Sequence, residues 1–121
     1  MEFLTGPDIV RLSNVGVVSE QLLSPHNSVS TRVTITRVTV EVGASQPRHA
    51  HAGSEQIWVA LRGAGILKLG GEETRHFEAG QIVRFPEGTI HGFKNTGTEA
   101  FVYIAVTSPP INFDYAYATN R

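Results

Sequence analysis

Turn signals divide this 121-residue chain into short β-type segments about every ten residues, and this spacing constrains the fold more than any other feature. The segments are rich in Val, Ile, Thr and aromatic residues, which favour strands, and each is bounded by Gly or Pro. They include VSTRVTITRVTVEVG (29–43), QIWVALRG (56–63), GILKLGGEETRHF (65–77) and FVYIAVT (101–107). No segment keeps helical spacing over three turns. The pattern therefore predicts an all-β antiparallel sandwich or barrel.

The segment 29–43 changes the phase of its alternation near its middle. Val33 and Ile35 share one face of an extended chain, whereas Val38 lies in the opposite phase. A change of phase within one strand is typical of a β-bulge or of a bend onto a second sheet. We therefore expect an irregularity at Thr36–Arg37.

Length, charge and hydropathy exclude several classes of protein. The chain has 10 basic and 11 acidic residues, interspersed, and no basic stripe of the kind that binds nucleic acid. No apolar stretch approaches the ~20 residues of a membrane helix, and the start of the chain lacks the basic and apolar regions of a signal peptide. We therefore expect a single domain over residues 1–121, located in the cytoplasm, without nucleic-acid or membrane partners.

Two histidines two residues apart are the first candidates for chemistry. His49 and His51 would share one face of a strand, about 6.6 Å apart along the chain, where two imidazoles can chelate one ion. The chain has no cysteine, so a metal must be held by imidazole, carboxylate, amide or backbone groups. The pair alone is a weak signal. His26 and His76 lie in turn-like surroundings, and we expect them at the surface.

Two longer motifs surround and follow this pair. In GASQPRHAHAGSE, five residues separate the first glycine from the histidine pair, and three residues separate the pair from the glutamate. GQIVRFPEGTIHGFKN contains Gly80, Pro86, Gly88, His91 and Asn95. Together they resemble the two sequence boxes of the cupin family, with a first motif over about 43–63 and a second over about 80–95.

The resemblance implies a cupin double-stranded β-helix, or jelly-roll barrel, that holds one divalent metal. In cupins the ion is held by the first-box pair, by a first-box Glu or its substitute, and by the second-box His. This implies His49, His51 and His91 as ligands here. Nitrogen and oxygen ligands suit Ni, Mn, Fe, Zn, Co or Cu, and the pattern does not choose among them.

The fourth ligand is either Glu55 or Gln56. In the family this ligand usually precedes by seven residues the glycine that closes its strand; here that glycine is Gly63, and the count leads to Gln56. The phrase SEQIWV also resembles small cupins with a Gln ligand, one group of which opens the rings of unsaturated uronate sugars. Glu55 follows His51 by four residues and would share its face on an unbroken strand, and periodicity does not decide. We predict Gln56, with Glu55 as the alternative and three histidines with water as a third arrangement.

Several neighbours are candidates for binding a substrate. With Gln56 as ligand the ion would keep its full 2+ charge, which favours anionic chelating ligands and lowers the pKa of bound water. Arg84 lies beside apolar residues and would either clamp an anionic substrate or pair with a carboxylate. Trp58 and Phe93 each follow a predicted ligand by two residues, and they either line the cavity mouth or belong to the core.

Three functions are compatible with this pattern. The first is a metalloenzyme that acts on a small acidic, sugar-acid-like substrate by isomerisation or ring opening. The second is a mononuclear Fe or Mn dioxygenase, because three histidines with open positions can hold Fe(II). The third is a non-enzymatic protein that binds a metal or a small ligand.

The C-terminal segment 109–121 has an aromatic residue at every second position. Phe113, Tyr115 and Tyr117 would share one face of an extended chain and need a surface to cover. That surface is either the chain's own barrel or a partner subunit. The apolar strands and this segment together predict a homodimer.

Overall fold

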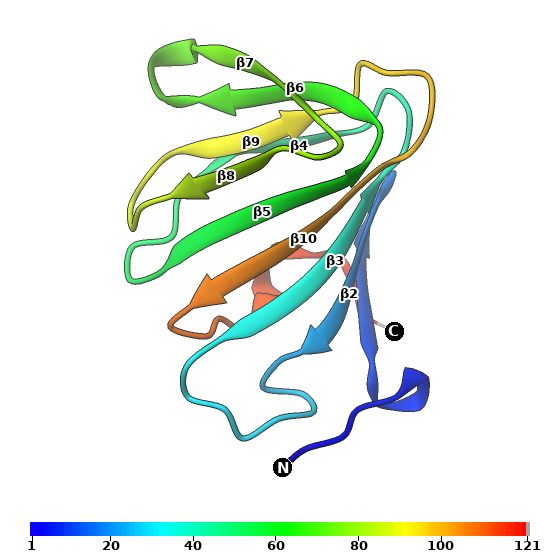
Figure 1. The fold of residues 1–121 in the computed structure, drawn as a ribbon, viewed down its shortest axis with the longest axis vertical. Helices are drawn as coiled ribbons and strands as arrows, with labels where there is room; N and C mark the ends of the chain where they lie inside the picture. The colour runs from blue at the N-terminus through cyan, green and yellow to red at the C-terminus, as the bar shows by residue number, and fades with distance from the viewer. Residues whose placement is uncertain (121) are drawn as a thin grey trace.

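Across residues 1–120, which the computed structural model describes, the chain forms two antiparallel sheets that face each other (Figure 1). The larger sheet runs in the order β11 (Thr119–Asn120), β1 (Val10–Asn14), β2 (Val17–Leu23), β3 (Thr34–Val40), β10 (Phe101–Ser108), β5 (Glu55–Arg62) and β8 (Ile82–Phe85). The smaller runs in the order β4 (Ser45–His49), β9 (His91–Lys94), β6 (Ala64–Leu69) and β7 (Thr74–Glu78). Single 3-10 turns span Gly6–Asp8, Gly70–Glu72 and Phe113–Ala116. The all-β prediction is confirmed.

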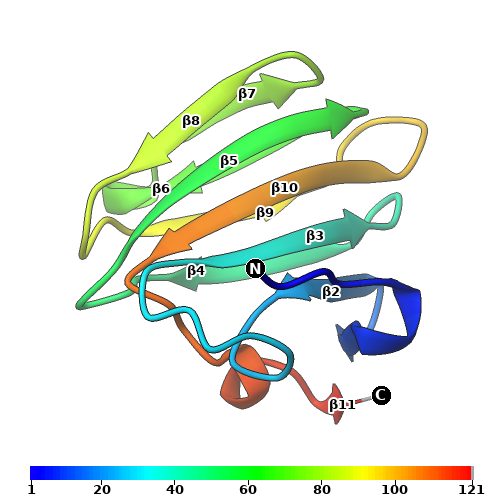
Figure 2. The same cartoon turned by 60° about the horizontal axis from the view of Figure 1, so that its bottom comes forward.

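Alternation along the strands builds the core between the sheets. In β10 the inward residues Phe101, Tyr103 and Ala105 are buried, and the apolar residues between them face outward. Figure 2 shows β4, β9 and β6 lying behind β3, β10 and β5, so that inward side chains of both sheets meet. The shared core includes Trp58 from the larger sheet and Phe93 from the smaller. No helix among residues 1–120 is long and apolar enough to cross a membrane.

The irregularity expected at Thr36–Arg37 is wrong. Strand β3 is regular there, and Thr34 and Thr36 face inward with Val38 and Val40. The register shift lies instead on β2, between Gln21 and Leu23. At the threonine end, Oγ1 of Thr34 donates to the carbonyl of Ile111 and accepts from its amide, so this inward face ends on backbone groups of the C-terminal segment.

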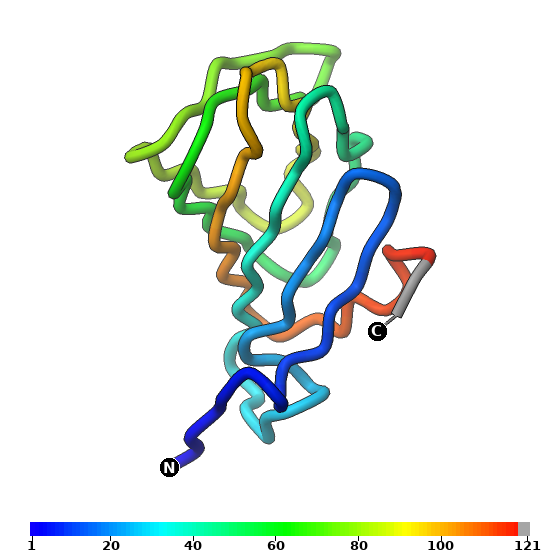
Figure 3. Tube along the Cα trace, turned by 90° about the vertical axis from the view of Figure 1, so that its right-hand side faces the viewer, coloured from blue at the N-terminus to red at the C-terminus, as the bar shows by residue number. Residues whose placement is uncertain are grey.

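The C-terminal segment folds back onto its own barrel. In Figure 2 the orange and red chain leaves β10 and turns below β3 and β2, and Figure 3 shows its end beside the blue N-terminal hairpin, where β11 pairs with β1. Residues Phe113–Ala116 form a 3-10 turn, so the expected extended aromatic face is wrong: Phe113 is buried, whereas Tyr115 is 71% exposed. Asp114 pairs with His26 at 2.9 Å and fastens the turn.

Candidate metal centre

Three histidines from two neighbouring strands and the loop between the sheets meet at one point. His49 ends β4 and is the direct register partner of His91, which begins β9, while His51 follows two residues after His49. One nitrogen of each ring lies within 4.8 Å of the corresponding nitrogens of the other two. His51 and His91 are buried and His49 is half-buried. Three nitrogen atoms at this spacing can hold one metal ion.

Backbone carbonyl groups orient two of these rings. Nδ1 of His49 lies 2.8 Å from the carbonyl oxygen of Pro47, and Nδ1 of His91 lies 2.9 Å from that of Thr89. A ring that donates its Nδ1 proton to a carbonyl presents a bare lone pair at Nε2, which is the form a metal requires. Strand β4, which contains Pro47, and the turn before β9, which contains Thr89, thus prepare both imidazoles as ligands.

Burial lowers the pKa of two of the three rings. Burial and repulsion from His49 lower the pKa of His51 to about 4. Burial also lowers the pKa of His91 to about 4, with smaller repulsion from the other two rings and an opposing effect of the Thr89 hydrogen bond. Both rings are therefore neutral near pH 7, so a metal ion would not compete with protons for them.

Gln56 faces this cluster, whereas Glu55 faces away. The side chain of Gln56 is only 5% exposed on the inward face of β5, and its Nε2 donates to Oγ1 of Thr107 at 2.9 Å. Its Oε1 accepts from Nε1 of Trp58 at 3.1 Å and lies 3.0 Å from Nε2 of His91. Glu55 lies on the outer face and pairs with Nε of Arg84 at 2.8 Å.

A neutral His91 has one proton for two contacts, so one of its ring nitrogens faces an oxygen without a proton between them. A neutral imidazole has one N–H, yet both nitrogens of His91 face oxygen acceptors, the Thr89 carbonyl and Oε1 of Gln56. If the proton is on Nδ1, two lone pairs face each other across 3.0 Å inside the protein. A cation bound to both atoms would remove this mismatch, so the donor set fits a metal ion.

Two residues predicted to bind substrate lie outside the pocket. Arg84 points outward with Ile82, because the face that they share is the solvent face of β8. Phe93 is fully buried and stacks on Phe101 at a centroid distance of 4.2 Å, so it is part of the core. Trp58 does line the pocket, and its ring centroid lies 5.5 Å from that of His91.

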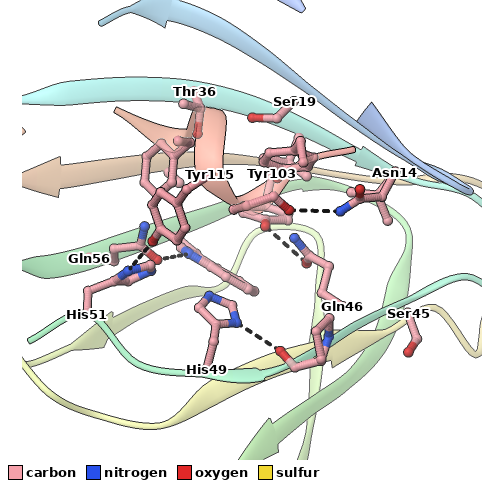
Figure 4. Close-up of a pocket in the computed structure, with 18 of the residues that line it drawn as sticks. Asn14, Ser19, Thr36, Ser45, Gln46, His49, His51, Gln56, Tyr103 and Tyr115 are labelled. Atoms are coloured by element: carbon pink, nitrogen blue, oxygen red, sulfur yellow. Dashed lines mark hydrogen bonds between the residues drawn. The ribbon is translucent and has the colours of Figure 1, made fainter. Parts of the chain in front are cut away.

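A cavity of about 390 Å³ extends from the histidines toward the C-terminal segment (Figure 4). Its wall includes Tyr103 from β10, Gln46 from β4, and Tyr115 and Tyr117 from the C-terminal segment. Tyr115 points toward His51, with its hydroxyl oxygen 3.5 Å from Nδ1. The alternation of β10 could have identified Tyr103 as inward-facing. The aromatic residues of the C-terminal segment predicted that it would cover a surface, but not that this surface would be the cavity.

Comparison with known proteins agrees with this architecture. Residues 36–107 match the family described as Cupin domain. An uncharacterised protein of Methanocaldococcus jannaschii is 25% identical over 99 residues, covering 82% of this chain and 78% of that protein. A Thermotoga maritima protein described as a predicted oxalate decarboxylase is 26% identical and superposes with a TM-score of 0.69. The match covers 77% of this chain and 80% of that protein. KdgF from Halomonas sp. is 22% identical and superposes with a TM-score of 0.71. The match covers 82% of this chain and 84% of that protein.

Proposed function

The chain belongs to the cupin domain family, and from this we propose that it is a metalloenzyme for a small acid. One divalent transition metal would be held by His49, His51, His91 and Gln56 and would face the cavity. When bound, the ion would supply a Lewis acid for isomerisation or ring opening of a substrate with a carboxylate and an adjacent oxygen.

The observation that carries this proposal is the 3.0 Å contact between Oε1 of Gln56 and Nε2 of His91. Thr107 and Trp58 hold the amide with its oxygen toward the imidazole, and no proton is available for both contacts of His91 when the ring is neutral. This oxygen accepts from Nε1 of Trp58 and still turns a lone pair toward Nε2 of His91, so one cation could bind both atoms.

The charge of the site favours an anionic ligand. Three imidazoles and an amide are all neutral, so they would leave the ion its full 2+ charge, while the only acid next to Gln56 in the chain, Glu55, is paired with Arg84 outside. Because Arg84 is also outside, the metal would be the group that attracts a carboxylate. The likeness to a protein described as a predicted oxalate decarboxylase supports a small chelating acid, since oxalate is one.

We also propose that the chain forms a homodimer through the outer face of its larger sheet. Ile57, Val59, Ile104 and Val106 are adjacent there in register, and Ile82 beside Val59 is 68% exposed. A second copy would cover this apolar surface. Sedimentation should show a dimer at micromolar concentration and a shift to monomer for Ile82→Arg; a monomeric parent chain would contradict the proposal.

Metal analysis and anaerobic activity test the proposed function. Protein purified without added metal should contain close to one divalent ion per chain, and small 2-keto or 2-hydroxy acids should raise its melting temperature only in the loaded form. Activity should survive with Ni²⁺ or Zn²⁺ without oxygen. Activity that requires both Fe²⁺ or Mn²⁺ and oxygen would identify a dioxygenase instead, and protein that binds no metal would sink both functions.

A further inference from the structure

The wall of the cavity is almost uncharged. Among residues 1–120, no Asp, Glu, Lys or Arg side chain lines it, and its histidines belong to the proposed metal site. A ligand in the cavity would therefore meet formal charge only at the metal, and any part of it remote from the metal must be uncharged.

The amide oxygens of Gln46, Gln56 and Asn14, three side chains of the wall, already accept hydrogen bonds. Oε1 of Gln46 accepts from the hydroxyl of Tyr103 at 3.1 Å, and the amide of Gln56 is occupied at both ends. Asn14 donates to the carbonyl of Ala116 and accepts from the amide of Ala118. A sugar carries a hydroxyl on almost every carbon, and each buried hydroxyl without a partner costs about 1–3 kcal/mol. The amide oxygens of this wall are therefore already occupied, which disfavours a ligand with many hydroxyls.

Aromatic rings form most of the remaining wall. Trp58 and Tyr103 are fully buried and stack on each other at a centroid distance of 4.1 Å and an interplanar angle of 23°. Their N–H and O–H groups are used by Gln56 and Gln46, so what they present to the cavity is apolar ring surface. Tyr115 and Tyr117 add two more rings from the C-terminal segment. Flat faces of this kind match a flat ligand.

We propose that the substrate is an acid with a flat aromatic ring, rather than a polyhydroxylated sugar acid. The inference rests on the proposed function, because the metal would hold the carboxylate and its adjacent oxygen. The ring would then lie in the aromatic part of the cavity, against Trp58 and Tyr103 on one side and the C-terminal segment on the other. Aryl-substituted 2-keto acids have this chemistry.

Three acids with the same metal-binding group and different remainders test the inference. Pyruvate, phenylpyruvate and 2-ketogluconate are titrated calorimetrically into the Zn²⁺-loaded full chain. Phenylpyruvate should bind at least about tenfold more tightly than either of the others, and its binding should shift the indole N–H signal of Trp58, the one tryptophan in the sequence. Equal affinities, or tightest binding of 2-ketogluconate, would overturn the inference and leave the proposed metal function standing.

Variants of Tyr115 test whether the aromatic ring of the ligand lies in the cavity. Tyr115→Leu should weaken phenylpyruvate binding by about threefold to tenfold and leave pyruvate unchanged, since an aromatic pair contributes about 0.5–1.5 kcal/mol. Tyr115→Phe keeps the ring and should bind like the parent. Phe3→Leu removes an exposed ring that is not part of the cavity wall and is the matched control. A Tyr115→Leu variant with unchanged phenylpyruvate affinity would contradict the proposed position of the ring.

A metal-free arm separates this inference from the proposed function. Zn²⁺ is first titrated alone, and failure to bind would refute the metal function. The ring preference is then measured on the metal-free chain with indole and methyl glucoside, again through the Trp58 indole signal. A shift with indole alone supports the aromatic cavity; a shift with the glucoside alone, with both equally or with neither overturns it.

Discussion

Oε1 of Gln56 lies 3.0 Å from Nε2 of His91, although the two residues belong to strands of different sheets. Two further hydrogen bonds, to Thr107 and from Trp58, fix the glutamine amide from within the core. The direction of this oxygen is therefore built by packing and does not depend on a bound ion. This preorganisation is what a metal site needs from its outer shell.

Exchanging acid and amide at positions 55 and 56 tests which of them serves the metal. Gln56→Glu should keep the metal at equal or higher affinity but weaken binding of anionic ligands, because it lowers the formal charge of the site from 2+ to 1+. Glu55→Gln removes only the exposed pair with Arg84, so metal affinity should change less than about twofold. Calorimetric titration with Ni²⁺ measures both. A large loss of metal in Glu55→Gln would show that the assignments are reversed.

Replacing His91 should abolish tight metal binding. His91→Ala removes a direct ligand, and the loss should exceed the roughly 10- to 100-fold effect of an outer-shell change. His76→Ala is the matched control, because His76 is exposed and lies 3.8 Å from Glu78, away from the cluster. Metal content and affinity of the two variants are compared by elemental analysis and titration. Equal affinity in both would refute the site.

Stability of the metal-free chain should decrease with acid between about pH 6.5 and 4. His51 and His91 have folded pKa values near 4, below the ordinary 6.5, so in this range the unfolded chain binds protons that the folded chain does not. The free energy of unfolding should therefore rise with pH across the window and level off above it. Urea titrations at several pH values in the presence of a chelator measure the slope. The slope should diminish in His51→Gln, and an unchanged slope would contradict the role of burial.

Gly92 controls how closely β9 approaches β4, which carries His49. A Cβ added at Gly92 would lie 2.8 Å from the carbonyl oxygens of Gln46 and Pro47, so the strands must separate. Gly92→Ala should cost about 1–3 kcal/mol of stability and weaken metal binding through displacement of His49. Gly53→Ala, where nothing lies within 4 Å, should be close to neutral in both. Denaturation and metal titration of this pair check the expectation.

The resemblance of the two motifs to those of cupins predicted the fold and the meeting of three histidines, which spacing within either motif alone would not have brought together. The count back from Gly63 identified an inward-facing residue, since Gly63 does end β5, with a φ of +84°, and Gln56 is buried. As a ligand, Gln56 remains a prediction. Periodicity alone could not distinguish Gln56 from Glu55, because Ile57 and Val59 make the outer face of this strand as apolar as its inner face.

The rest of the site could not be predicted, because its residues are placed by contacts between segments far apart in the sequence. Arg84 was expected either to clamp an anionic substrate or to pair with a carboxylate, and the second alternative holds: it pairs with Glu55 on the exposed face that it shares with Ile82. The C-terminal aromatics were expected to alternate, but a 3-10 turn at Phe113–Ala116 separates them. That turn is held by contacts with residues far away in the sequence, such as His26 with Asp114, which no local pattern encodes.

A crystal structure of the metal-loaded chain tests the central claim most directly. The account predicts one ion bound by His49, His51 and His91, with Oε1 of Gln56 about 2.0–2.2 Å from it and Glu55 still paired with Arg84. An ion at that distance from a Glu55 oxygen with Gln56 turned away, or an ion bound elsewhere, would contradict it.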